Sequence, residues 1–203
     1  MPMQYKPSRL SSETVCQNIY VGRHEALAPK NVQAAADLIA EWKIPGFGMV
    51  EEDEEGVRCI GANLTITWGD FQNVFHTDGD VGPAFGTWFL SRDNGELVME
   101  PEEIQGAVEG GCLVFPEYKI AIDFGACAGV VDVLWHGSED LHCTAFSKTK
   151  PGYRRIGTSC QLSAKLHDRI VSIRSEGEVP RVRGMKVTVD ELTERLERLL
   201  NDK

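Results

Sequence analysis

The sequence predicts an α+β protein that is mainly β, with a sandwich or barrel core flanked by an N-terminal helix and a C-terminal helix. Two observations lead to this fold class. Short β-rich runs such as GTWFLS, GCLVFP and VVDVLW follow one another between residues 57 and 162, separated by Gly, Asp and Asn. Helical periods are confined to segments outside that stretch. About eight short strands joined by turns, with no helices between them, are typical of sandwiches and barrels.

The N-terminal part contains one helical pattern. Residues 1–30 show no strong period, so we expect a surface run with QNIYVG, at 17–22, as its one candidate strand. Residues 31–43 have apolar side chains on one helical face. That apolar stripe is formed by Val32, Ala35, Ala36, Ile39 and Ala40. Pro45 and Gly46 then end the helix.

The C-terminal part predicts an irregular segment followed by a helix. Residues 163–187 are polar and irregular, and 188–203 has a leucine stripe. Thr188 followed by Glu191 is the signature of a capping box at the start of that helix. The leucine stripe consists of Leu192, Leu196, Leu199 and Leu200.

The length of the chain favours a single domain. We expect one domain over residues 1–203, with a β-core at about 57–163 and helical or polar extensions at 1–56 and 164–203. A hydrophobic content of 42% suits a chain of this length that buries its own core. The run of five acidic residues at 51–55 is expected to be a solvated loop.

Charge and hydropathy limit the classes of function. A net charge of −10 argues against a protein whose whole surface binds nucleic acid. No stretch approaches the roughly 20 consecutive apolar residues that cross a membrane, and the N-terminus lacks an apolar secretory core. We therefore expect an intracellular protein, cytoplasmic or nuclear. None of the six cysteines forms a CxxC pair, so a zinc knuckle is disfavoured.

The strongest chemical pattern is a histidine and a carboxylate on one strand-like run, FQNVFHTDGD. His76 and Asp78 stand two residues apart, so an extended backbone points both side chains to the same side. One further imidazole would complete a face of two histidines and one carboxylate, which suits non-haem Fe(II) with open positions. Within the β-core, His136 and His142 are both candidates for that third ligand.

A longer series of motifs gives this pattern its context. HTD is followed by GGCLVFPEYKIAID, then VVDVLWHG, then LHCT and finally RRIG. This succession, over roughly residues 60–163, resembles the core of the Fe(II)/2-oxoglutarate-dependent dioxygenases, and within them the TET/JBP-like branch. The resemblance implies a double-stranded β-helix, the jelly-roll of cupin-like proteins. It also implies Fe(II) as the metal, with 2-oxoglutarate and O2 as co-substrates.

The resemblance also assigns roles to particular residues. It implies that His76, Asp78 and His142 hold the metal, with His142 preferred to His136 because it follows the VDVLWHG strand by one short turn. Arg155 matches the arginine that binds the far carboxylate of 2-oxoglutarate, which a guanidinium can grip through two parallel hydrogen bonds. Its neighbour Arg154 then has the wrong strand parity.

Two positions depart from the family pattern. The family commonly has Arg-x-Ser at this place, whereas this chain has Gly157 two residues after Arg155. Thr158 is a candidate to supply the missing hydroxyl, as is the serine that follows it. The usual Gly-Asp before the distal-histidine strand is replaced by Val131-Asp132. On the HTD run, Asn73 is a further candidate for a contact with the co-substrate.

The resemblance makes a methyl group on a modified nucleobase in DNA or RNA the first substrate class. A basic segment near the C-terminus is the candidate phosphate contact. Its cations are Lys165, Arg169, Arg174, Arg181 and Arg183. An ordinary solvated connector explains these charges equally well.

Several alternatives remain open from the sequence. The same chemistry on a small molecule or a protein side chain would use the same metal site. A non-catalytic, cupin-like protein that binds a metal or ligand is a second reading, although such proteins usually present more histidines. A β-sandwich interaction module without a metal is a third. The oligomeric state is not indicated.

Overall fold

The computed structural model describes residues 12–47, 58–176, 178–182 and 185–188 of the chain. Its largest element is an antiparallel sheet. The strands of this main sheet, in spatial order, are β1 (Asn63–Trp68), β9 (Tyr153–Gln161), β2 (Ala84–Arg92) and β6 (Val131–Trp135). The long strands β9 and β2 lie at its centre. This mixture of helices and mainly antiparallel strands confirms the predicted α+β, mainly β fold class.

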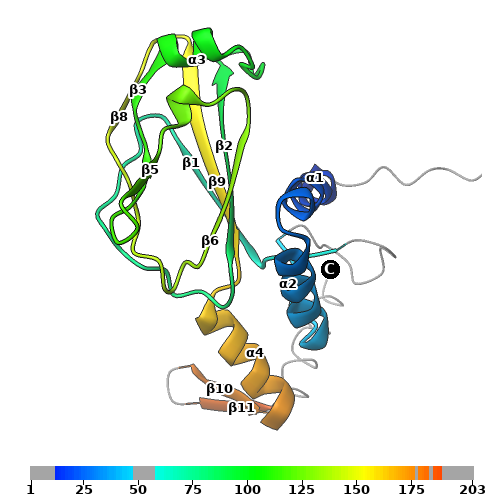
Figure 1. The fold of residues 1–203 in the computed structure, drawn as a ribbon. Coiled ribbons are helices and arrows are strands. Elements are labelled where there is room, and N and C mark those ends of the chain that lie inside the picture. Colours follow the sequence, from blue (N-terminus) through cyan, green and yellow to red (C-terminus); the bar gives the residue numbers. More distant parts are fainter. Residues whose placement is uncertain (1–11, 48–57, 177, 183–184, 189–203) are drawn as a thin grey trace, which may run out of the picture.

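A second layer of short elements packs against one face of the main sheet (Figure 1). Its two small sheets are β5 (Ile120–Ile122) with β4 (Leu113–Phe115) and β7 (Cys143–Thr144), and β3 (Val108–Gly110) with β8 (Ser147–Thr149). The helix α3 (Pro101–Ala107) and the 3-10 turn η1 (Phe124–Ala126) lie at one end of this layer. We call the face of the main sheet that meets this layer the inner face.

The inner face is closed by a cluster of large apolar side chains. Trp88 and Trp135 from the main sheet pack against Leu113 and Phe115 of β4 and Phe124 of η1. These side chains remove apolar area from water, which is the main source of packing energy. The two layers are therefore joined by an apolar core, and the polar site described below opens beside it.

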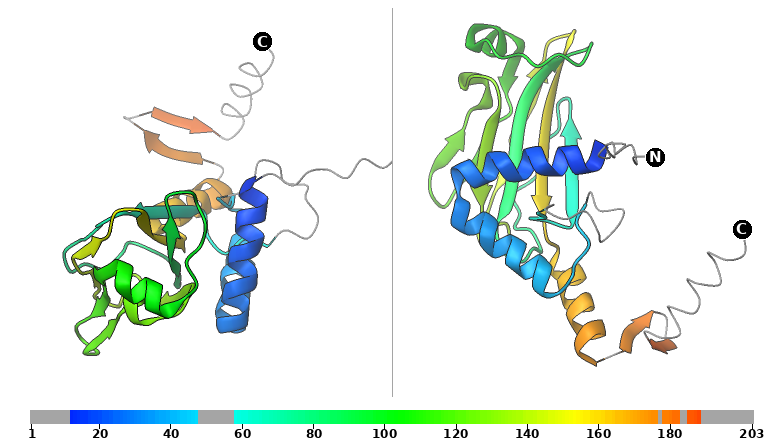
Figure 2. Two further views of the ribbon diagram at one scale, coloured as in Figure 1. Left: turned by 90° about the horizontal axis from the view of Figure 1, so that it is seen from above. Right: turned by 90° about the vertical axis from the view of Figure 1, so that its right-hand side faces the viewer.

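Two helices cover the outer face of the main sheet. They are α1 (Ser12–Leu27) and α2 (Pro29–Glu41), and Figure 2 shows α1 crossing the strands. Tyr20 and Val21 of α1 pack against Phe85 and Cys160. A salt bridge of 2.7 Å between Arg23 and Asp132 of β6 ties the same helix to the sheet.

The helix predicted at 31–43 is confirmed as α2, but three other expectations were wrong. Residues 12–27 are helical rather than a surface run with a strand, because Tyr20, Val21 and His24 are buried against the sheet although the sequence shows no strong period. The helix α3 interrupts the β-rich stretch. The segment expected to be irregular forms α4 (Ala164–Glu176) and the hairpin of β10 (Glu178–Val182) with β11 (Met185–Thr188).

Two predicted segments lie outside the described residues. The acidic run at 51–55 is one, and the C-terminal helix expected at 188–203 is the other, apart from Thr188, which ends β11. In the part of the chain that the structure describes, no helix is both long and apolar enough to cross a membrane.

Candidate metal centre

Two segments far apart in sequence bring His76, Asp78 and His142 together. The connection between β1 and β2 carries His76 and Asp78, and His142 directly precedes β7. The backbones of His76 and His142 are paired through two N–H···O hydrogen bonds of 3.0 Å. One ligand atom from each of the three side chains lies within 4.8 Å of the other two. The predicted ligand set therefore converges at one point, and His142 is the histidine brought to it.

The two imidazoles are held in the tautomer that a metal needs. Nδ1 of His76 lies 2.9 Å from the carbonyl of Val74, and Nδ1 of His142 lies 2.8 Å from the carbonyl of Asp140. A carbonyl can only accept, so each Nδ1 carries the proton and each Nε2 keeps a free lone pair. The Nε2 atoms lie 3.4 and 3.5 Å from the carboxylate oxygens of Asp78.

The Asp78 carboxylate is oriented by its own partners. Gln161, on β9, donates from Nε2 to Oδ2 of Asp78 over 3.1 Å. The backbone N–H of Asp78 donates to the carbonyl of Gly137 over 2.6 Å. A Cβ on Gly137 would lie 3.0 Å from Oδ2 of Asp78, so a side chain there would press on the carboxylate. The sequence did not indicate Gln161 as a site residue, although strand alternation places it on the same face of β9 as Arg155.

The three side chains border a cavity of about 150 Å³. Its polar lining also includes Thr65, Thr67, Asn73, Thr144 and Gln161. His142 is buried, whereas the side chain of His76 is 35% exposed, so the ligand set opens on one side. Two imidazoles and one carboxylate beside such a cavity are a donor set that fits Fe(II) with open positions.

The electrostatics of this ligand set favour a cation. Burial lowers the pKa of His142, but the Asp78 carboxylate and the Asp140 carbonyl raise it by more, so that it lies above its ordinary value. Burial raises the pKa of the nearby Asp80 to about 6, and the negative charge of Asp78 adds to that shift. Carboxylates crowded at low solvent exposure repel one another, and a bound cation would relieve that repulsion.

Arg155 lies on the inner face of β9 and is only 5% exposed. Its Nη2 donates to the carbonyl of Gly111 over 2.6 Å, while its buried Nε has no hydrogen-bond partner among the described residues. Gly111, at φ +81°, lets the backbone approach so closely that a Cβ would lie 3.0 Å from that Nε. A buried guanidinium with an unused donor is chemically suited to bind a carboxylate. Burial lowers its pKa, yet arginine remains charged.

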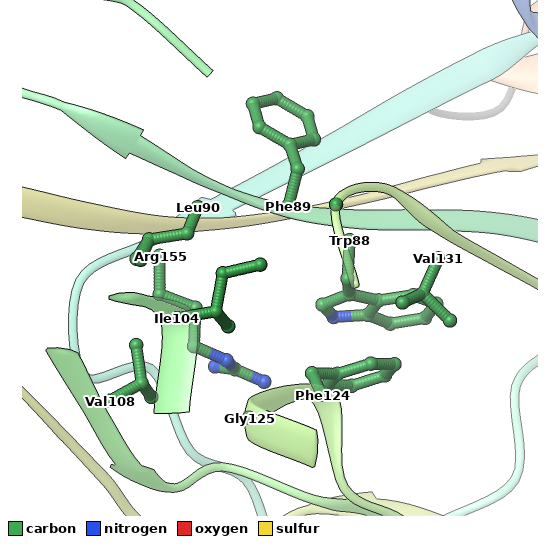
Figure 3. A pocket seen from close by; sticks show the side chains of 10 residues that line it. Trp88, Phe89, Leu90, Ile104, Val108, Phe124, Gly125, Val131 and Arg155 are labelled. Atoms are coloured by element: carbon green, nitrogen blue, oxygen red, sulfur yellow. The ribbon is translucent and has the colours of Figure 1, made fainter. Parts of the chain in front are cut away.

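Arg155 does not border the same cavity as the three ligands. It lines a second, apolar cavity of about 20 Å³ together with Trp88, Leu90, Ile104 and Phe124 (Figure 3). Its guanidinium carbon lies 5.7 Å from the centre of the Phe124 ring. Trp88 borders both cavities and therefore stands between them.

Four further residues that the sequence analysis considered, Asn73, Thr158, Arg154 and His136, lie outside the ligand group. Asn73 lines the metal cavity, but its Oδ1 already accepts from the backbone N–H of Thr144 over 2.6 Å. Thr158 borders the metal cavity, but its hydroxyl bonds Tyr20 and the carbonyl of Thr87 on the helix-covered face. Arg154 points outward and pairs with Asp93 on the surface. His136 is exposed and lies outside the ligand group.

The basic candidates are only partly described. Lys165, Arg169 and Arg174 are exposed on α4, which begins three residues after β9 ends beside the metal cavity. Arg174 donates to the carbonyl of Lys43 over 3.1 Å. The side chain of Arg181 and all of Arg183 lie outside the described part of the structure.

Comparison with known proteins agrees with this geometry. A family model described as the Tet-like 2OG-Fe(II) oxygenase superfamily matches residues 3–147, and the chain belongs to that family. The match includes all three metal-site residues and ends before Arg155. A search of curated proteins found no match.

Among solved structures, the chain is similar to NgTET1 in complex with 5mC DNA, with a TM-score of 0.45 and 12% sequence identity. That alignment covers 78% of this chain and 55% of NgTET1, so the chain spans about half of that protein.

Proposed function

We propose that this chain is an Fe(II)- and 2-oxoglutarate-dependent dioxygenase in which residues 1–203 form one domain, with a double-stranded β-helix core at about 57–163. The observation that carries the proposal is the convergence of His76, Asp78 and His142, with both Nε2 atoms turned toward the carboxylate. Membership of the Tet-like 2OG-Fe(II) oxygenase family supports the same reading.

Different residues of the chain would bind the metal and the co-substrate. His76, Asp78 and His142 would hold Fe(II), and Arg155 would bind the far carboxylate of 2-oxoglutarate through its unused Nε donor. When bound, the metal and co-substrate supply the O2-dependent oxidation of a C–H bond. The protein fixes the donor geometry and surrounds it with an apolar wall, formed by Trp88, Trp135 and Leu113, that excludes water.

We propose a methyl group on a nucleobase as the substrate, because family membership and the surface around the cavity favour it. Phe71, Val74 and Phe75 precede His76 on the same connection and are exposed, although apolar side chains of this size are usually buried. Exposed aromatic rings beside an open metal site can stack on an extruded base. Lys165 and Arg169 on the adjacent α4 offer contacts for phosphate.

The proposal is tested by anaerobic addition of Fe(II) and then 2-oxoglutarate to the purified chain. We expect the weak visible absorption that bidentate binding of 2-oxoglutarate to Fe(II) produces. His142→Ala should abolish it, whereas His136→Ala, at an exposed histidine six residues away, should leave it intact. Arg155→Ala should weaken binding of 2-oxoglutarate, and Arg154→Ala serves as its matched control.

The outcomes separate the candidate functions. Iron binding without the absorption would favour a cupin-like metal-binding protein, and no iron binding would exclude the oxygenase. If the absorption appears, oxidation of 5-methylcytosine is measured by mass spectrometry in a single strand, a duplex and the free nucleoside. Activity on the free nucleoside alone would indicate a small-molecule substrate instead of a nucleic acid.

A further inference from the structure

The residues on the inner face of β9 form a row that runs from Arg155 to the metal site. Strand alternation places Arg155, Gly157, Ser159 and Gln161 on the same face. Arg155 holds the unused donor at one end of the row, and Gln161 contacts the Asp78 carboxylate at the other. Resting on the proposed function, a 2-oxoglutarate molecule bound to the metal and to Arg155 would lie along this row.

The Trp88 indole lies across that row. Trp88 is directly paired with Gly157 in the register of β2 and β9. A Cβ on Gly157 would lie 2.5 Å from Nε1 of Trp88, and a Cβ on Gly86 would lie 2.4 Å from Cζ3 at the far edge of the ring. The indole therefore lies flat on the backbone of these two glycines, Gly157 on β9 and Gly86 on β2. We call this surface the Gly86–Gly157 bed.

This bed explains the departure from the family pattern at Gly157. A serine two residues after Arg155 cannot coexist with the observed indole, because its Cβ would overlap the ring. The absent hydroxyl and the position of Trp88 are thus one structural feature. The volume that a side chain at position 157 would need is occupied here by the indole.

The indole is held in place from its other side. Phe124 stacks on Trp88 with ring centres 4.7 Å apart and planes 12° apart, as Figure 3 shows. Trp135 contacts it at 5.9 Å, and Trp88 is only 7% exposed. The cavity left around Arg155 has a volume of about 20 Å³, enough for about one water molecule. A five-carbon diacid cannot enter it while the indole lies on its bed.

We propose that Trp88 is a gate between the metal site and Arg155, and that its indole must leave the Gly86–Gly157 bed before 2-oxoglutarate can bind to both. The metal cavity, at about 150 Å³, has room for a smaller 2-oxo acid without that movement. Trp88 therefore selects between diacids, which require the open gate, and monocarboxylic 2-oxo acids, which do not.

The first test measures how fast 2-oxoglutarate binds. Fe(II)-loaded protein is mixed with 2-oxoglutarate without oxygen, and the visible absorption is followed in time. In the wild type, the rate should level off at high 2-oxoglutarate because gate opening becomes limiting. Trp88→Phe keeps a ring on Phe124, but the smaller ring obstructs the row over Gly157 less than the indole does, so its rate should keep rising with concentration. Trp68→Phe, at an exposed tryptophan on the outer face, is the matched control.

An equilibrium measurement gives the size of the effect. If the gate is open in about one molecule in ten, the smaller ring should tighten 2-oxoglutarate about tenfold. The affinity for pyruvate, which lacks the far carboxylate, should be equal in wild type and Trp88→Phe. Equal 2-oxoglutarate affinities and equal, unsaturated rates in the two proteins would overturn the gate.

The second test observes the indole itself. The chain has four tryptophans, so protein labelled with 5-fluorotryptophan gives four ¹⁹F signals, and the Trp88→Phe spectrum identifies the one from Trp88. With Zn(II) as a diamagnetic substitute for Fe(II), 2-oxoglutarate should shift the Trp88 signal and pyruvate should not. Binding of 2-oxoglutarate with an unmoved Trp88 signal would refute the gate alone. Failure of 2-oxoglutarate to bind wild type and Trp88→Phe alike would refute the proposed function, and the gate with it.

Discussion

Gln161 and Asp78 are joined by a hydrogen bond of 3.1 Å from the amide Nε2 to the carboxylate Oδ2. The Asn63 amide reaches the other side of the same glutamine, with Nδ2 3.4 Å from its Oε1. The end of β9 thereby sets the rotation of the carboxylate that both histidines face. A partner of this kind controls how well a site binds a metal without being a ligand itself.

Replacing Gln161 should weaken the metal site without unfolding the protein. We expect Gln161→Leu to lower Fe(II) affinity by about 10- to 100-fold, because the Asp78 carboxylate loses its orienting donor. Binding is measured by anaerobic titration, with thermal unfolding recorded in parallel. Gln33→Leu, at an exposed glutamine of α2, is the control. Unchanged Fe(II) affinity in a folded Gln161→Leu protein would show that the hydrogen bond is incidental.

Gly157 and Trp88 should be energetically coupled. Gly157→Ser restores the family pattern but places a Cβ against the indole, so we expect it to destabilise the protein by about 1–3 kcal/mol. The smaller ring of Trp88→Phe should recover part of that loss in the double variant. Urea unfolding of the two single variants and the double variant gives the interaction energy. Strictly additive changes in unfolding free energy would mean that the two residues do not compete for this space.

His24 should make the protein sensitive to mild acid. It is fully buried between Tyr20 and Phe85, and neither ring nitrogen has a hydrogen-bond partner among the described residues. Burial lowers the pKa of His24 below that of an exposed histidine, and Asp132 opposes this shift only in part. In the unfolded chain His24 binds a proton near pH 6.5, whereas in the folded protein it does so only at lower pH. The free energy of unfolding therefore falls as the pH drops below about 6.5.

The measurement is the free energy of unfolding in urea between pH 8 and pH 5. The contribution of one such histidine approaches about 1.4 kcal/mol per pH unit below its unfolded pKa. His24→Leu should remove this slope, while His136→Leu, at an exposed histidine, should retain it. The same slope in all three proteins would assign the acid sensitivity to other groups.

The Tyr20 hydroxyl should contribute to the docking of α1. It lies 2.7 Å from the Thr158 hydroxyl and donates to the carbonyl of Phe85 at 3.2 Å. Tyr20→Phe keeps the ring and leaves buried polar partners unsatisfied, so we expect a loss of about 1–3 kcal/mol in unfolding free energy. A change below about 0.5 kcal/mol would show that water replaces the hydroxyl. Binding of Fe(II) should not change, because this contact lies on the outer face of the sheet.

The sequence by itself determined the features that depend on residue type and local period. The stripe around Val32 and Ile39 predicts α2. The alternation of β9 predicts that Arg155 and Arg154 point to opposite faces, and the family resemblance singles out Arg155 as the inward one. The two-residue spacing of His76 and Asp78 on an extended backbone predicts that their side chains converge. Such features follow from backbone geometry over a few residues, so a single segment contains the information.

Only the tertiary structure decided which segments meet. His142, which the resemblance preferred to His136, lies beside His76 because the backbones of the two residues are paired, and α1 owes its burial to a sheet that begins 36 residues after the helix ends. Only the register of β2 with β9 places the indole of Trp88 over Gly157. These relationships depend on contacts between distant parts of the chain, where packing overrides local preference.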